Sequence, residues 1–158
     1  MRKKKSLVLL YSVGISFLAG GIGSVFTYSA IPTWYAQLSK PFFNPPNWLF
    51  GPVWSLLYVC MGISLFLIYT TKTKETIKNG AVSIFYVQLV LNAVWSILFF
   101  GLKNPGIALV EIICLWLFIL LTIVRFDKIN RIAGGLLIPY LLWVSFASVL
   151  NLSIVILN

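Results

Sequence analysis

The sequence contains no histidine, and its two cysteines, Cys60 and Cys114, are far apart and form no C-x-x-C pattern. A structural zinc site, a haem iron held by histidine and a His-based catalytic triad all depend on residues of these kinds. Both cysteines fall inside apolar runs, where cysteine usually serves as a small hydrophobic side chain. We therefore expect neither a metal site nor a bound cofactor, and the cysteines do not indicate a redox compartment.

Charged side chains are also scarce. Only 9% of the 158 residues are charged and 60% are hydrophobic, whereas globular domains average about 25% charged and about 45–50% apolar residues. Three acidic and twelve basic side chains cannot cover a soluble domain of this size, so lipid must surround most of the protein. The net charge of +9 lies in short clusters between long uncharged runs, which argues against a nucleic-acid partner.

Five runs, uncharged except for Glu111 in the fourth, are long enough to cross a bilayer, which takes about 20 apolar residues. Because the connections are short, neighbouring helices should be antiparallel. The first run follows a basic cluster and could be a secretory signal, but it continues to Ala30, which favours an uncleaved helix. The sequence predicts an all-α membrane protein, a single domain of five transmembrane helices at about residues 6–30, 48–71, 79–102, 104–124 and 132–156.

Basic residues are distributed unequally between the two sides of this bundle. All but two of the twelve, Lys40 and Lys103, lie at the N-terminus or in the second and fourth connections. Cytoplasmic loops carry an excess of Lys and Arg, so the N-terminus is predicted to be cytoplasmic and the C-terminus outside.

The first connection, residues 31–47, reads IPTWYAQLSKPFFNPPN and is rich in proline and aromatic residues. Its prolines remove backbone donors and fix φ, so we expect a semi-rigid loop with at most a short helix around residues 34–38. The aromatic residues fit either a belt at the membrane interface or a lid over a cavity open to the outer side.

Aromatic and amide side chains recur at 4, 3, 4 spacing in three of the predicted helices, which places each set on one face. Buried amides are costly in lipid, so these faces should point into the bundle, either to join helices or to line a ligand site. In the first helix Ser16, Gly20, Gly23 and Thr27 form a stripe of small residues, which suits close packing. The inward sets are Trp54, Tyr58, Met61 and Leu65; Gln88, Asn92, Trp95 and Phe99, with Ser96 beside them; and Pro139, Trp143, Phe146 and Leu150, with Ala147 beside them.

Glu111 is the only acidic residue within a predicted span. A charge at mid-membrane costs about 2.5 kcal/mol or more, so this side chain should be protonated or hydrogen-bonded to another helix. Intramembrane acids often mark function, and a hydrogen bond that joins helices is the alternative. On the second interpretation, replacement by leucine should lower stability.

The run WYAQLSKPFFNPPNWLFGPVWSLLYVCMGIS, Trp34–Ser64, resembles the signature of the translocator protein (tryptophan-rich sensory protein, TspO/MBR) family. QLVLNAVWSILFF, ALVEII and PYLLWVSFASVLN provide further matches at compatible spacing, so the resemblance extends over nearly the whole chain. It implies a five-helix bundle, often a homodimer, whose pocket is capped by the first loop. In that family the pocket accepts protoporphyrin IX and related tetrapyrroles, synthetic benzodiazepine-type ligands and, in animal members, cholesterol.

Carried over by motif position, the resemblance implies a ligand pocket in this chain. Without histidine, a tetrapyrrole there would be held by shape, stacking and hydrogen bonds. The chain ends in NLSIVILN, without the tyrosine and basic residue of the animal sterol motif, which argues against tight sterol binding and favours a prokaryotic plasma-membrane protein. The implied pocket residues are Trp48, Trp54, Tyr58, Gln88, Asn92, Trp95, Trp143, Phe146, Ala147 and Leu150, and the helical faces add Phe99.

Three functions compete at this point. The first is a tetrapyrrole-binding protein that senses or transports its ligand. The second is an enzyme that degrades porphyrin with light and oxygen through Trp54 and Trp143, since no tuned acid, base or nucleophile is evident. Secondary active transport is the least supported, because five spans show no inverted repeat.

Overall fold

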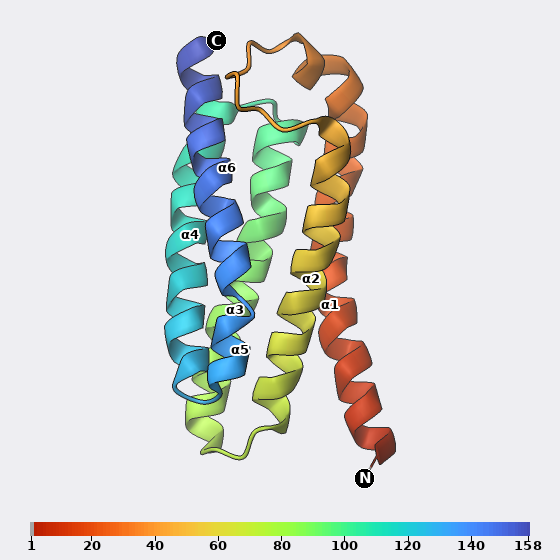
Figure 1. The fold of residues 1–158 in the computed structure, drawn as a ribbon, viewed down its shortest axis with the longest axis vertical. Helices are drawn as coiled ribbons and strands as arrows, with labels where there is room; N and C mark the ends of the chain where they lie inside the picture. The colour runs from red at the N-terminus through yellow and green to blue at the C-terminus, as the bar shows by residue number, and fades with distance from the viewer. Residues whose placement is uncertain (1) are drawn as a thin grey trace.

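The computed structural model describes residues 2–158, with side chains from Lys4 onward, and it is a bundle of long antiparallel helices (Figure 1). The chain termini lie at opposite ends of the bundle. The elements are α1 (Arg2–Ala30), the π-helix η1 (Ile31–Tyr35), α2 (Asn47–Thr70), α3 (Glu75–Ser96), the π-helix η2 (Ile97–Gly101), α4 (Pro105–Asp127), the short α5 (Arg131–Gly135) and α6 (Ile138–Leu157).

Among the described residues, five helical segments are long and apolar enough to cross a membrane, which confirms the predicted fold class. The segments are Lys4–Tyr35, Asn47–Thr70, Glu75–Gly101, Pro105–Asp127 and Arg131–Leu157. The last is interrupted at Leu136 and Leu137, directly before Pro139 in the first turn of α6, where a missing backbone N–H is tolerated.

The long loop predicted between the first two helices is not confirmed. The first helix continues beyond Ala30 through η1, and only about residues 38–46 are irregular. A π turn accommodates Pro32, because its wider hydrogen-bonding ring moves the carbonyl that the proline ring would otherwise meet. The proline cluster therefore ends the helix later, between Leu38 and Asn47.

Helix α1 packs against both α2 and α3, and α4 packs against α3 and α6. Glycine permits the closest of these approaches. A Cβ added to Gly62 of α2 would lie 2.6 Å from the Cα of Val13, and one added to Gly20 of α1 would meet the ring of Tyr58. At Gly62 and Val13 the two helices therefore touch in the half of the bundle that contains the N-terminus.

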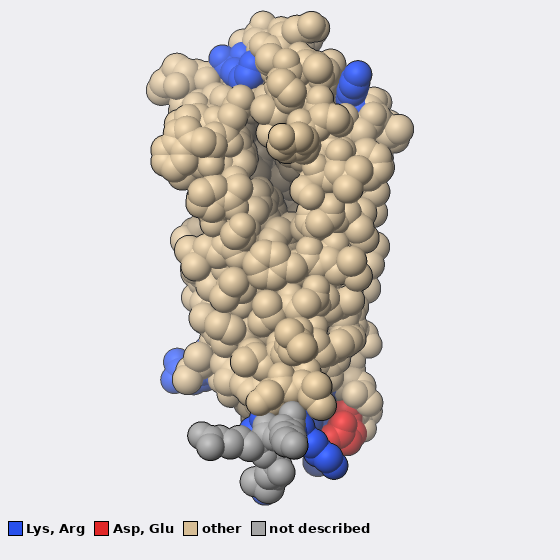
Figure 2. Space-filling view, turned by 90° about the vertical axis from the view of Figure 1, so that its right-hand side faces the viewer, with Lys and Arg blue, Asp and Glu red and all other residues tan. Residues whose placement is uncertain are grey.

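The same half holds most of the apolar core. Met61, Leu65, Phe85 and Phe126 are buried, and the last two rings stack at 5.6 Å. At its edge the hydroxyl of Tyr86 forms hydrogen bonds with those of Tyr11 and Tyr69, joining three helices, α1, α2 and α3. Charged side chains gather at the two ends of the molecule, and the surface between them in Figure 2 is uncharged, as a bilayer requires.

Candidate functional site

A cavity of about 840 Å³ lies between α1, α2, α3 and α6, in the half of the bundle nearest the C-terminus. This is within the range of small-molecule pockets, about 300–1,000 Å³. Figure 2 shows a hollow on the side wall of the bundle at this level.

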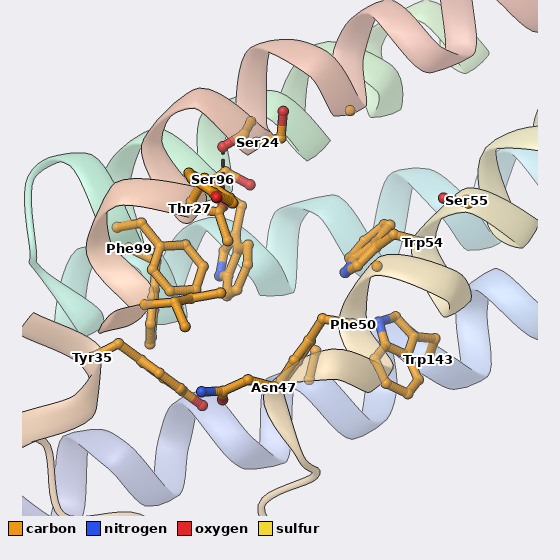
Figure 3. Close-up of a pocket in the computed structure, with 18 of the residues that line it drawn as sticks. Ser24, Thr27, Tyr35, Asn47, Phe50, Trp54, Ser55, Ser96, Phe99 and Trp143 are labelled. Atoms are coloured by element: carbon orange, nitrogen blue, oxygen red, sulfur yellow. Dashed lines mark hydrogen bonds between the residues drawn. The ribbon is translucent and has the colours of Figure 1, made fainter. Parts of the chain in front are cut away.

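Two tryptophans, each beside a second aromatic ring, form one wall. Trp54 stacks on Tyr58 with ring centroids 5.5 Å apart, and Trp143 meets Phe50 edge-on at 6.1 Å. These rings come from α2 and α6, and Figure 3 shows Phe50, Trp54 and Trp143 close together at one side of the cavity. The wall therefore offers broad aromatic surface for stacking.

A second aromatic group comes from α3, η2 and η1. Trp95 stacks on Phe99 at 5.0 Å, and Tyr35 lies 6.3 Å from the Phe99 ring. Tyr35 is only 3% exposed, and its hydroxyl donates to Asn44 Oδ1 at 2.8 Å. Figure 3 places Phe99 and Tyr35 apart from the Trp54 and Trp143 rings, so the cavity is bounded by aromatic side chains from two directions.

The polar groups of the cavity are few. Asn151 Oδ1 accepts from Trp95 Nε1 at 3.1 Å, and its Nδ2 donates to the Pro105 carbonyl, so both ends of this amide are already bonded to protein. The hydroxyls of Ser24 and Thr27 bond to carbonyls of their own helix. Within the described residues, the side chains of Asn47, Ser55 and Ser96 remain without a hydrogen bond and can serve a ligand.

The sequence pattern of the TspO/MBR family matches residues 12–157. The chain belongs to the TspO/MBR family. Tryptophan-rich protein TspO of Archaeoglobus fulgidus is 47% identical over 152 residues, covering 96% of this chain and 97% of the relative. Tryptophan-rich protein TspO of Chlorobaculum tepidum is 44% identical over 155 residues, covering 98% of each chain. The human translocator protein is 36% identical over 131 residues, covering 82% of this chain and 78% of its own length.

The family prediction is thus confirmed, and the five apolar spans make this member a multi-pass membrane protein. Most residues that the TspO/MBR signature implied for the pocket lie on the cavity wall, together with Phe99 from the helical faces. They are Trp48, Trp54, Tyr58, Trp95, Phe99, Trp143, Ala147 and Leu150.

Gln88, Asn92 and Phe146 do not line the cavity. Asn92 lies behind Tyr58: it accepts from the Tyr58 hydroxyl at 2.7 Å and donates to that of Tyr140 at 2.9 Å, so it holds the ring that does line the cavity. Gln88, one turn further from the cavity, is 1% exposed and has no hydrogen-bond partner among the described residues. Phe146 turns toward the connection between η1 and α2, residues 36–46, which we call the cap, and packs on Phe43 at 6.2 Å.

The sequence reasoning missed the part of the wall that α1 contributes. The stripe of small residues that suggested only helix packing lines the cavity with Gly20, Gly23 and Thr27. It does both, because Gly20 contacts the Tyr58 ring and a Cβ on Gly23 would lie 2.8 Å from Ser96 Oγ. The sequence signal that could have predicted this part of the wall is that the stripe can pair with the inward face of α2. Other lining residues not predicted for the site include Phe17, Tyr35, Asn47, Phe50, Ser55 and Asn151.

Glu111 lies apart from the cavity on α4. Its side chain is 9% exposed, so it faces protein as expected. The predicted hydrogen bond to another helix is not formed, because neither carboxyl oxygen has a partner in the described part of the chain. Its buried neighbours on the same face, Ala108 and Leu115, are apolar and offer none.

Proposed function

We propose that this protein binds a flat tetrapyrrole, of which protoporphyrin IX is the simplest example, in the aromatic cavity and uses that binding for sensing or carriage in the membrane. Membership of the TspO/MBR family, with relatives named tryptophan-rich sensory protein and translocator protein, supports a sensing or binding role in a membrane. The observation that carries the tetrapyrrole assignment is the pair of aromatic walls around a cavity of about 840 Å³.

Stacking supplies the attraction in this proposal. Each aromatic ring that stacks on a flat heterocycle contributes about 1–3 kcal/mol, judged from bases on aromatic side chains. Trp54 and Trp143 on one side and Trp95 and Phe99 on the other provide several such surfaces. The few free polar groups then orient the ligand rather than hold it.

The acidic side chains of a porphyrin also find a matching charge. Lys40 Nζ lies 5.0 Å from the centre of the Tyr35 ring, which lines the cavity, and Asn47 adds an amide at the same end. Porphyrin propionates would therefore point toward the cap, with the macrocycle between the aromatic walls.

Light-dependent porphyrin degradation is the second candidate. It is favoured by the position of Trp54 and Trp143 on the same cavity wall, where two oxidisable indoles would stand beside an excited porphyrin. The chemistry would come from the ligand, light and oxygen.

Both candidates are tested by titrating the purified protein in lipid nanodiscs with protoporphyrin IX, in darkness and under illumination. Saturable quenching of tryptophan fluorescence with a stable Soret band supports binding, and light-dependent loss of that band, faster than with empty nanodiscs, supports degradation. Quenching no greater than that of a Lys40→Glu, Trp54→Ala, Trp143→Ala triple variant would overturn the proposal.

A further inference from the structure

The packing of α1 against α2 changes along the length of the two helices, from close contact to a gap. In the N-terminal half Gly62 lies against the backbone of Val13, and the helices touch. Toward the C-terminal half both helices carry small, exposed residues that line the cavity: Gly21, Ser24, Gly51 and Ser55. A Cβ added to Gly21 or Gly51 would meet nothing within 4 Å. Figure 2 shows a hollow on this side of the bundle, in the same half of the molecule.

The end of the bundle above the cavity is closed instead. The connection from η1 to α2 runs across to the end of α6 and back (Figure 1). The Ser39 backbone N–H donates to Asn158 Oδ1, and Asn158 Nδ2 donates to the Ser39 carbonyl, both at 3.0 Å. Phe43 packs on Phe146, and Tyr35 is bonded to Asn44. The cap is therefore fastened to α6 and to η1, whereas no hydrogen bond joins α1 to α2 at the gap among the residues that the structure describes.

We propose that the cavity exchanges its ligand directly with the hydrocarbon of the surrounding leaflet, through a lateral portal formed by Gly21, Ser24, Gly51 and Ser55. This inference rests on the proposed function for its ligand, but the portal is a property of the wall itself. It defines the ligand class as amphipathic ring systems that dissolve in the bilayer, with the polar end toward the headgroups.

The side chains at the rim of the portal suit a ligand that enters from the lipid. Tyr28 and Trp48, one turn closer to the cap than Ser24 and Gly51, line the cavity and are 85% and 71% exposed. Tyrosine and tryptophan favour the level of the lipid headgroups, where one part of the ring is wet and the rest apolar. A ligand held at the interface by its carboxylates would meet these two rings before it reached Trp54 and Trp143.

The first test obstructs the portal without touching the aromatic walls. In lipid nanodiscs, Gly51→Phe and Gly21→Phe should slow both the association and the dissociation of protoporphyrin IX by about tenfold, because a barrier at the entrance acts on both rates. Gly14→Phe is the matched control: Gly14 is exposed on α1, away from the cavity, with nothing within 4 Å of an added Cβ. Equal rates in the portal and control variants would overturn the proposal.

The second test needs no porphyrin. A nitroxide is attached to Ser55→Cys, with Cys60 and Cys114 replaced by alanine, and its collisions with oxygen, which dissolves in lipid, and with a water-soluble nickel chelate are measured by electron paramagnetic resonance. High oxygen and low nickel accessibility is the expected result, and high nickel accessibility would overturn the portal. If protoporphyrin IX shows no saturable binding, the proposed function fails, and the nitroxide measurement alone decides on the portal.

Discussion

Trp143 illustrates how one side chain connects the packing of the bundle to the surface of the cavity. Its ring contacts Phe50 edge-on and Phe146 at 5.6 Å, so neighbours on α2 and α6 fix its orientation. A ring held in this way stacks on a ligand without losing further side-chain freedom on binding.

Replacing Trp143 with alanine should therefore weaken protoporphyrin IX binding by about 1–3 kcal/mol, measured by fluorescence titration in nanodiscs. Trp116→Ala provides the control. The Nε1 of Trp116 donates to Ser145 Oγ at 2.7 Å between α4 and α6, outside the cavity. Its removal should leave affinity nearly unchanged. Equal losses in both variants would show that the cavity is not the binding site.

The prediction for Glu111 concerns the stability of the fold and not ligand affinity. A buried polar group without a partner costs about 1–3 kcal/mol, and both carboxyl oxygens are in that state. Glu111→Leu should therefore raise the melting temperature in detergent, which reverses the expectation from sequence alone. Glu111→Gln, which keeps two polar atoms, should change it little. A lower melting temperature for the leucine variant would mean that the carboxyl group has a partner that stabilises the fold.

Large aromatic side chains on inward helical faces were the most reliable sequence signal for the site. Trp54, Tyr58 and Trp143 stood out because large aromatic rings recur on inward faces, and they do line the cavity. Asn92 and Gln88 share the same inward face of α3, but their depth along the helix places them beside the core rather than the cavity. Depth depends on where the neighbouring helices separate, which a single helical face does not encode.

The spans are the elements that the sequence predicts best, because charge and hydropathy decide them directly. The π turns η1 and η2 are missed, since π and α geometry differ in backbone hydrogen bonds and not in side-chain composition. Pro32 was interpreted as a sign of a loop, although the wider turn lets the helix continue past it.

In the packing of helix pairs, Gly62 should be the position where α1 and α2 are least able to accommodate an added side-chain atom. Gly62→Ala would force its Cβ to within 2.6 Å of the Val13 Cα, and overpacking of this kind costs about 1–3 kcal/mol. Gly14→Ala on the exposed face of α1 gains the same helix propensity without the clash. The melting temperature of Gly62→Ala should therefore fall below that of Gly14→Ala, and equal values would contradict the close approach.

For the whole molecule, the distribution of basic residues predicts the orientation. Lys40 and Lys103 are at the end that carries the cap, and the remaining basic residues lie at the other end or next to it. This bias predicts that the cap, the cavity and the C-terminus lie on the outer side of the membrane.

Cysteine labelling in intact cells measures this orientation. With Cys60 and Cys114 replaced by alanine, Ser39→Cys and Asn158→Cys should react with an impermeant thiol reagent, because both positions are exposed at the cap. Thr73→Cys, in the connection between α2 and α3, should react only after the cells are permeabilised. Reaction at Thr73 alone in intact cells would reverse the orientation.

The contacts around the lateral portal have a mechanical consequence. The contact between Gly62 and Val13 fixes the edge of the portal nearer the N-terminal end of the bundle, and Asn158 fixes the cap at the opposite edge. A portal fixed at both edges widens only when α1 bows outward into the lipid. Tightly ordered acyl chains resist such bowing and fluid chains yield to it, so the temperature at which the bilayer melts should set how fast the cavity fills.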